Sequence, residues 1–294
     1  MIVRVLGSAA GGGVPQWNCG CGHCAAARAG LAPRRSQSSF AVSADGARWW
    51  LINVSPDVAA QIEDFAPLQP QELRGSPIAG MLLTDANVDH VGGLAVLRQT
   101  HPKGFELFSS DVVRRIATVQ AAFAPFTEPP HRWHAVAVPF ALDGGALRVT
   151  PVPVPGLTPG YAGRERIPGA VVAYRVEAPA TGTSVLFAPV FAAIDEVLAV
   201  ALAGVDVAFL DGSFWSDDEL RAEGLDDKPA RSLGHLPVGG TEGSLGMIGG
   251  LRNRRIYAHL NNSNPLLDPA SQASEALRAA GAELAFDGLE IRFP

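Results

Sequence analysis

The fold is decided by one stretch of sequence, Ile78-Ala79-Gly80-Met81-Leu82-Leu83-Thr84-Asp85-Ala86-Asn87-Val88-Asp89-His90-Val91-Gly92-Gly93. Its apolar first part predicts a buried β-strand over Ile78–Thr84. The polar residues that follow, Asp85, Asp89 and His90, then lie at the carboxyl end of a strand, where they can point together at one ion or substrate. The alternative is a polar turn in which Asp89 only caps a helix. Spacing alone favours neither interpretation.

On both sides of this stretch, short apolar strands alternate with helices. The chain contains 32 glycines and 23 prolines, so its regular elements must be short and numerous. We expect further strands over Ile2–Leu6, Ser39–Ser43, Trp49–Val54, Phe105–Phe108, Leu147–Val154, Val171–Val176, Ser184–Ala188, Val205–Leu210, Arg255–His259 and Glu283–Phe286. We expect helices over Asp57–Phe65, Asp111–Ala122, Ala192–Ala203 and Asp268–Ala280, the last of them capped by Asp268 with Pro269 just inside.

This order of elements predicts an α/β protein, a four-layer αββα sandwich of two mixed β-sheets with flanking helices. The chain has 294 residues, 47% of them hydrophobic, which is enough apolar material for one large core. No low-complexity tract or convincing linker interrupts it, so we expect a single domain over residues 1–294 with two similar halves. The stretch Pro151–Pro168 is dense in proline and glycine and should form a long surface loop near the mouth of a site.

Charge and hydropathy exclude several classes of partner. The net charge is −6 and no Lys/Arg block occurs, which argues against nucleic acid or an anionic membrane as the main partner. No apolar run is long enough to span a bilayer. The N-terminal segment Met1–Gly7 lacks the apolar region of a signal peptide and is expected to be a strand, so a cytoplasmic location is predicted.

All three cysteines, Cys19, Cys21 and Cys24, lie within six residues. An odd, tightly clustered set is a poor disulfide framework, and it suits a reducing compartment. Thiolates this close, with glycines between them, can surround one tetrahedral Zn²⁺, which predicts a structural zinc knuckle over residues 17–24. The alternative is three small buried residues in a loop. Spacing does not fix the fourth ligand, for which His23, His235 and Asn262 are candidates.

The stretch from Thr84 to Gly93 resembles the metallo-β-lactamase superfamily motif Thr-His-x-His-x-Asp-His-x-Gly-Gly. In this chain Asp85 and Asn87 replace the two histidines that hold the first metal of the usual pair. The resemblance makes Asp89 and His90 ligands of the second metal. It also places Pro189-Val190 near the position of the usual bridging aspartate, which is absent.

Later segments resemble the same superfamily. Val207–Gly212 resembles a strand that ends in an acidic residue, Asp211, and Gly234-His235 resembles a mobile segment of the phosphodiesterase branch. Ile256–Asn262 resembles the last strand, whose histidine, here His259, is a metal ligand. Nearly end to end, the chain is similar to the branch of the superfamily that takes part in the biosynthesis of pyrroloquinoline quinone (PQQ). The runs Trp17-Asn18-Cys19 and Asn261–Pro265 are the most specific parts of that likeness.

The resemblance leaves a mononuclear site of Asp89, His90 and His259, the two-histidine-one-carboxylate set of non-heme Fe(II) oxygenases. It implies an iron-dependent hydroxylase that uses O₂ to oxidise the tyrosine ring of a Glu–Tyr-derived PQQ precursor, a small molecule or dipeptide. Other proteins of the PQQ pathway are possible partners. Zinc could also occupy the site. His235 and Asp211 would handle protons or orient the substrate, although His235 could equally be idle, and Asp85 would orient a ligand or be an additional one.

Two other functions remain open. A carrier would hold PQQ or its precursor without chemistry, and a residual metal-dependent hydrolase is disfavoured by the missing ligands. Arg164 and Arg166 could pair with substrate carboxylates, but we favour solvated charges. His131 and His134 could line the substrate mouth, but we favour a loop. His101 is expected at a surface turn.

Overall fold

The computed structural model describes residues 1–99 and 103–294 and arranges their strands in two seven-stranded sheets. The first sheet has the order β14-β1-β2-β3-β4-β5-β6, with β1 Ile2–Gly7, β2 Ser39–Ser43, β3 Trp49–Ile52, β4 Ile78–Leu82, β5 Glu106–Ser109, β6 Arg132–Ala135 and β14 Glu290–Arg292. The second has the order β13-β12-β11-β10-β9-β8-β7, with β7 Phe140–Leu142, β8 Leu147–Pro153, β9 Val172–Ala178, β10 Thr183–Ala188, β11 Val207–Asp211, β12 Arg254–Ala258 and β13 Glu283–Leu284.

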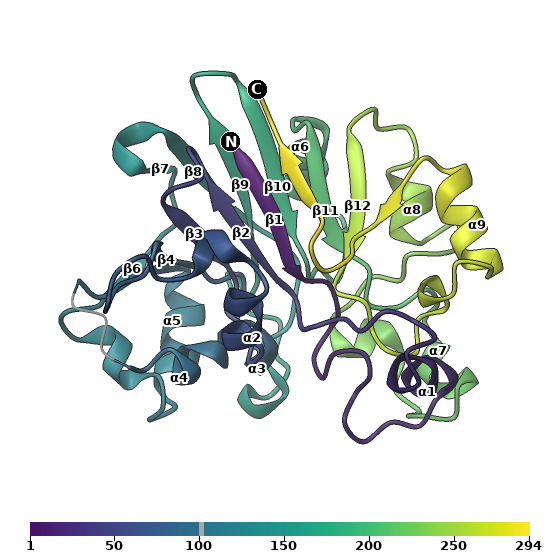
Figure 1. The fold of residues 1–294 in the computed structure, drawn as a ribbon. Coiled ribbons are helices and arrows are strands. Elements are labelled where there is room, and N and C mark those ends of the chain that lie inside the picture. The colour runs from purple at the N-terminus through teal and green to yellow at the C-terminus, as the bar shows by residue number, and fades with distance from the viewer. Residues whose placement is uncertain (100–102) are drawn as a thin grey trace.

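The two sheets repeat one pairing pattern. From β14 to β3 the neighbours are antiparallel, and from β3 to β6 they are parallel. From β7 to β10 the neighbours are likewise antiparallel, and from β10 to β13 they are parallel. The two mixed sheets and their similar halves are therefore as predicted. The last strand, β14, returns to pair with β1, so both ends of the chain lie at one sheet (Figure 1).

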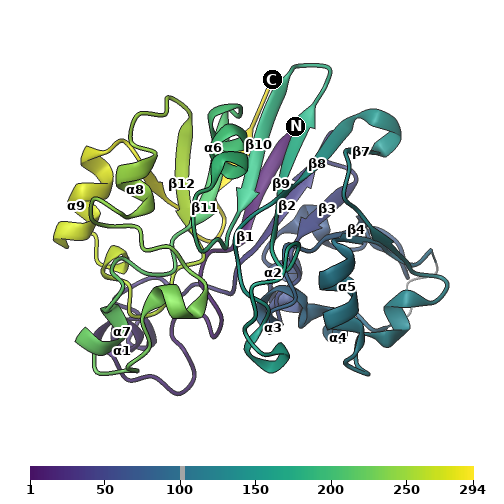
Figure 2. The ribbon, with the colours of Figure 1, turned by 180° about the vertical axis from the view of Figure 1, so that it is seen from behind.

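Helices cover the outer faces of the sheets. They are α1 Gly22–Arg28, α2 Val58–Glu63, α3 Val88–Val91, α4 Gly93–Val96, α5 Asp111–Thr118, α6 Glu196–Ala203, α7 Glu219–Ala222, α8 Ser244–Met247 and α9 Gln272–Ala279. In both views, α2 to α5 gather beside the first sheet and α8 and α9 beside the second (Figures 1 and 2). This arrangement confirms the four-layer αββα sandwich.

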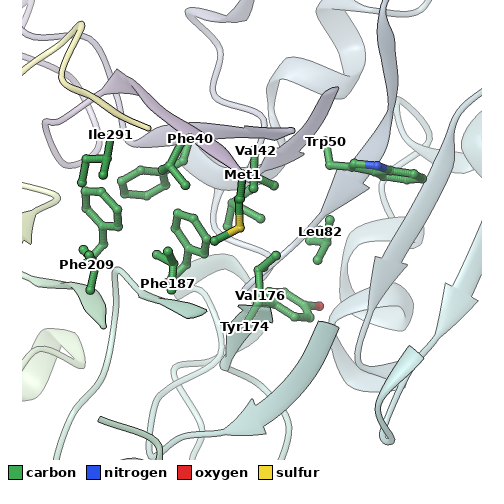
Figure 3. Close-up of a cluster of buried hydrophobic side chains, with 14 of the residues drawn as sticks. Met1, Phe40, Val42, Trp50, Leu82, Tyr174, Val176, Phe187, Phe209 and Ile291 are labelled. Carbon is green, nitrogen blue, oxygen red and sulfur yellow. The ribbon is translucent and has the colours of Figure 1, made fainter. Parts of the chain in front are cut away.

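Three apolar clusters hold the layers together, as a four-layer sandwich requires. The central one lies between the sheets, where Phe40 of β2 contacts Phe187 of β10 and Phe209 of β11 at ring-centroid distances of 5.3 and 5.0 Å (Figure 3). A second cluster joins the first sheet to its helices, and a third joins the second sheet to its own. Strands inside each sheet, such as β3 and β11, are therefore buried on both faces, which explains their continuous apolar runs.

Some predicted boundaries were wrong. Helix α9 begins at Gln272 and is capped by Ser271, whose side chain accepts from the backbone N–H of Ser274, because Asp268 instead caps a turn at Ala270. Helix α6 begins at Glu196, not at Ala192, because Asp195 is its capping residue.

The proline- and glycine-rich loop begins later than predicted. Its first residues complete strand β8, so the loop proper runs from 154 to 171 and contains one short 3₁₀ turn, Gly160–Ala162. Within the described parts of the chain, no helix has the length and apolar character needed to cross a bilayer. His101, expected at a surface turn, lies outside the described residues.

Candidate metal centre

The predicted ligands come from the carboxyl ends of strands in both sheets. Asp89 and His90 lie on α3, the short helix that follows β4, and His259 directly follows β12. Both strands run parallel to a neighbour, and the carboxyl ends of such strands are where sites form in α/β sheets. The φ of His259 is 60°, a conformation that non-glycine residues adopt rarely and that clusters at functional sites.

One ligand atom from each of Asp89, His90 and His259 lies within 4.8 Å of the other two. Nε2 of His259 is 3.2 Å from Oδ2 of Asp89, and Nε2 of His90 is 3.8 Å from the same oxygen. Nε2 of His90 is buried and has no hydrogen-bond partner among the described residues. A buried polar atom without a partner is costly, so the donor set fits an ion that would complete it.

Asp85 holds His90 from behind. Its Oδ2 accepts from Nδ1 of His90 at 2.6 Å and from Oγ1 of Thr84 at 2.9 Å. Its Oδ1 accepts from the backbone N–H and the side-chain amide of Asn87 at 2.9 and 2.8 Å. Since both oxygens are occupied, Asp85 is placed to fix the tautomer and ring orientation of His90, with Nε2 left for an ion.

Ser213 holds His259 in the corresponding way. Nδ1 of His259 lies 2.7 Å from the Ser213 hydroxyl, which donates to Oδ1 of Asp211 at 2.6 Å. Oδ2 of Asp211 accepts from Nδ1 of His235 at 2.8 Å. The ring of His235 lines a cavity in front of the ligands, and its Nε2 takes no part in this network.

The hydrogen-bonded and charged neighbours in this network shift the pKa values of the ligands and of His235. Burial alone would lower the pKa of His90, but the charges of Asp85 and Asp89 outweigh it and raise the pKa to about 9. Burial opposes ionisation of Asp89, but His90 and His259 outweigh it and hold the pKa of its carboxyl below the usual range. The pKa of His235 is raised in spite of burial, because Asp211 stabilises the imidazolium.

The geometry favours one ion. Asp85 and Asn87 occupy the positions of the first-metal histidines, and they bond to each other. Asp211, His235 and His259 also offer ligand atoms within 4.8 Å of one another, but the Ser213 hydroxyl lies among them and bonds to all three. That second group is a hydrogen-bond network.

An open cavity of about 230 Å³ lies in front of the ligands. Asp89, His235 and His259 form one part of its wall. Other lining residues come from the glycine-rich loop, from the loop 154–171 and from the segments after β11 and β12: Ala10, Gly11, Leu157, Thr158, Gly160, Arg164, Ser213, Phe214 and Asn261. A Cβ at Gly11 would lie 3.3 Å from the Asp89 carboxyl carbon, so the glycine run allows this loop to approach a ligand closely.

The three cysteine thiols also lie within 4.8 Å of one another, where α1 begins. Of the candidate fourth ligands, Asn262 is near, with its side-chain amide 3.1 Å from Sγ of Cys19 and 3.6 Å from Sγ of Cys21. Nδ1 of His23 is turned to the Asn262 carbonyl oxygen at 3.0 Å. Nδ1 of His235 bonds instead to Asp211, beside the Asp89–His90–His259 centre.

The remaining polar residues divide between the cavity and the surface. Arg164 and Arg166 are both exposed, which fits solvated charges, but Arg164 also lines the cavity and Arg166 does not. His131 lies just before the edge strand β6 and stacks on Phe105, His134 lies on that strand and stacks on Phe108, and neither lines the cavity.

Sequence reasoning missed Ser213. The sequence does contain a signal for it. Ser213 lies two residues after Asp211, and in an extended chain side chains two residues apart point to the same side.

The class of protein follows from this fold and site. Residues 48–260 match the model of the beta-lactamase superfamily domain, so the chain is a member of that superfamily. Its fold is shared by a diphosphatase from the PhnP family (TM-score 0.71, 22% identity, 100% of this chain and 98% of that chain). The short form of human tRNase Z shares it too (TM-score 0.61, 15% identity, 100% of both chains).

Relatives of higher sequence identity show which family within the superfamily the chain belongs to. The coenzyme PQQ synthesis protein B of Rhizobium meliloti (strain 1021) is 39% identical over 99% of this chain and 97% of its own length. That of Azotobacter vinelandii (strain DJ / ATCC BAA-1303) is 39% identical over 99% of both. The crystal structure of Zn²⁺-bound PqqB from Methylobacterium extorquens superposes with a TM-score of 0.93 and 34% identity over 100% of both chains. The chain belongs to the coenzyme PQQ synthesis protein B family.

Proposed function

We propose that this chain is an iron-dependent hydroxylase that oxidises the tyrosine ring of a Glu–Tyr-derived precursor of PQQ. The observation that carries the proposal is the convergence of Asp89, His90 and His259, in which Nε2 of buried His90 has no hydrogen-bond partner in the described part of the chain. Two imidazoles and one carboxylate around an ion with open positions are the ligand set of non-heme Fe(II) oxygenases. Iron(II) held there would supply the activation of dioxygen that ring hydroxylation needs. Because the same ligands accept zinc, the identity of the metal is part of the proposal.

The remaining polar residues of the centre have roles that follow from their contacts. Asp85 and Ser213 keep Nδ1 of the two histidine ligands engaged, so that each directs Nε2 to the ion. His235 would take the phenol proton of the substrate at Nε2, because Nδ1 is already bonded to Asp211. The carboxylate of Asp211 stabilises the imidazolium that this transfer would form.

The cavity wall suits a ring with polar ends. Leu157, Val190 and Phe214 offer apolar contact to an aromatic ring, and the polar side chains of Thr158 and Asn261 lie among them. Such a mixture of apolar surface and a few placed polar groups is typical of small-molecule sites.

The test is turnover by protein loaded anaerobically with iron(II). Ring hydroxylation inserts one atom of O₂ into a C–H bond and reduces the other to water, which takes two electrons and two protons. The assay therefore contains Glu–Tyr, O₂ and ascorbate as reductant, and it measures O₂ uptake and a product heavier by one oxygen atom. We expect His90→Ala and Asp89→Ala to lose this turnover, and Arg166→Gln, outside the cavity, to retain it. Unchanged turnover in the first two variants would refute the assigned centre.

Other outcomes would favour the alternatives. Tight binding of PQQ or its precursor that survives removal of the metal, without turnover, would support a carrier. Phosphodiester hydrolysis that depends on Asp89 and His90 would support a residual hydrolase, although the occupied oxygens of Asp85 leave no evident place for a second ion.

A further inference from the structure

We infer that Arg164 binds the glutamate side-chain carboxylate of the substrate at the wall of the cavity and thereby selects acidic precursors. The inference rests on the proposed function, because it names the substrate class of the same cavity. It concerns binding and not the chemical step, so it can be tested without turnover.

Arg164 has the position and the chemistry for this role. Its side chain lines the cavity that Asp89 and His259 also line. Among the described residues, its guanidinium has neither an ion pair nor a hydrogen bond, whereas Arg132 and Arg254 both pair with glutamates. A planar guanidinium matches a carboxylate with two parallel N–H···O bonds, so a cation left free at a cavity wall is a natural anchor for an acidic ligand.

The loop that carries Arg164 is fixed by its own hydrogen bonds. Buried Thr158 donates from its backbone N–H to the Glu165 carbonyl at 2.9 Å, and its hydroxyl accepts from the Glu165 N–H at 2.8 Å. The Arg164 N–H donates to the Pro159 carbonyl at 3.3 Å, and the residue has a φ of 54°, which only an ordered turn would hold. The backbone of Arg164 is therefore set before a ligand arrives, which lowers the entropic cost of binding.

The same loop is attached to the metal centre. The Tyr161 hydroxyl donates to the Ala86 carbonyl, one residue after Asp85. The guanidinium of Arg164 lies over Gly160, where an added Cβ would be 3.3 Å from Nε of Arg164. The loop is thus bonded to the turn that carries the ligands, and a substrate could place its ring at the ion and its glutamate carboxylate at Arg164.

The experiment measures binding to zinc-loaded protein, in which the redox-silent metal keeps the ligand unreacted. Glu–Tyr and Gln–Tyr are titrated by calorimetry against the wild type, Arg164→Gln, Arg164→Lys and the matched control Arg166→Gln. We expect Arg164→Gln to weaken Glu–Tyr binding about tenfold or more and to change Gln–Tyr binding much less, since a hydrogen bond to a charged group has this magnitude. Arg164→Lys should retain part of the affinity, and Arg166→Gln all of it.

The outcomes separate this inference from the proposed function. Equal losses for both dipeptides, or equal behaviour of the two arginine variants, would overturn the role of Arg164 and leave the hydroxylase untouched. Arg164-dependent binding of Glu–Tyr without turnover by the iron form would overturn the hydroxylase and leave the role of Arg164 intact. Failure of the wild type to bind Glu–Tyr would overturn both. Because Arg164 is exposed, its variants are expected to fold.

Discussion

Asp85 does not line the cavity in front of the ligands, but both of its oxygens accept hydrogen bonds from neighbouring groups, His90 among them. We predict that Asp85→Asn weakens metal binding at the catalytic centre about 10- to 100-fold, the usual effect of losing a group that orients a histidine ligand. The asparagine can offer only one acceptor oxygen to donors on both sides. Cobalt(II) titration measures the affinity of each site separately. Cobalt bound by the cysteines of the knuckle gives thiolate absorption bands, and cobalt bound by Asp89, His90 and His259 does not.

The control for that titration is Asp111→Asn, whose carboxylate pairs with Arg114 and Arg115 on the outer surface of α5. It should bind cobalt(II) like the wild type at both sites. Equal affinities for Asp85→Asn and the wild type would contradict the orienting role, provided that the variant shows the thermal unfolding of a folded protein.

Glu219 is a buried carboxyl outside the metal centre. It accepts from the Ser263 hydroxyl at 2.5 Å and from the Trp215 N–H at 2.6 Å, and burial raises its pKa to about 7 from the 4.5 of an unfolded chain. The fold therefore favours the neutral acid. This contribution is complete below about pH 4.5 and is lost as the pH rises through 7.

Glu219→Gln should remove that pH dependence, because glutamine can keep both contacts without ionising. Relative to the variant, the wild type should lose up to about 3 kcal/mol of unfolding free energy between pH 4.5 and 8. Urea unfolding across this range measures the difference, with exposed Glu275→Gln as the control. Parallel pH profiles for the wild type and Glu219→Gln would show that the buried carboxyl ionises freely.

Individual residues show the limit of sequence reasoning at this scale. Asp89, His90 and His259 could be chosen because the motif fixes their types, although 169 positions separate His259 from its neighbour His90. The role of Asp85 stayed open between ligand and orienting group, because the choice depends on where Thr84 and Asn87 donate. Arg164 and Arg166 could not be told apart until the turn of the loop was known.

At the scale of elements, the turn between α3 and α4 is packed without space for a side chain. A Cβ at Gly93 would lie 2.2 Å from the Ser55 carbonyl oxygen and 2.5 Å from Cγ1 of Val54. Gly93→Ala must therefore push the segment after β3 away from the helix that carries two ligands. We predict a loss of about 1–3 kcal/mol in unfolding free energy, the usual range of an overpacked core.

Gly250→Ala is the matched control, since a Cβ at Gly250 meets nothing within 4 Å and its φ is not positive. Chemical denaturation should show Gly250→Ala within about 0.5 kcal/mol of the wild type. Similar stabilities for the two alanine variants would contradict the prediction, because they would mean that the backbone around Gly93 can move apart at little cost in free energy.

Element boundaries were predicted where the chain marks them and missed where it does not. Strands such as β2 and β10 are apolar and bounded by turn residues, so their positions were close to correct. Strands β6, β7 and β14 were missed because they are three or four residues long and lie at or near the sheet edges, where few apolar residues are needed. The cap of α9 was misassigned because aspartate and serine are both good caps only three residues apart.

In the whole molecule, the metal centre and the core both require the two sheets to be packed against each other. The ligands come from the ends of β4 and β12, one in each sheet, and the central cluster packs one sheet against the other. The alternation of strands and helices could predict this sandwich, because each half repeats the same order. It could not predict that β14 returns to β1, since three residues near the chain end carry no such signal.

A single domain over residues 1–294 remains a prediction, and the central cluster makes it testable. Phe187 has no exposed surface and stacks on Phe209 at 5.4 Å while its ring also meets Phe40 across the sandwich (Figure 3). Phe187→Ala should cost about 3–5 kcal/mol. If neither sheet is stable without the other, the loss must lower the unfolding midpoint of both halves equally. Pulsed hydrogen exchange in a urea gradient, read by mass spectrometry on peptides from β3 and β11, compares the halves directly. In the wild type the two midpoints should coincide, and in the variant they should fall together. A first sheet that keeps its midpoint while the second loses its protection would show two folding units meeting at the metal centre.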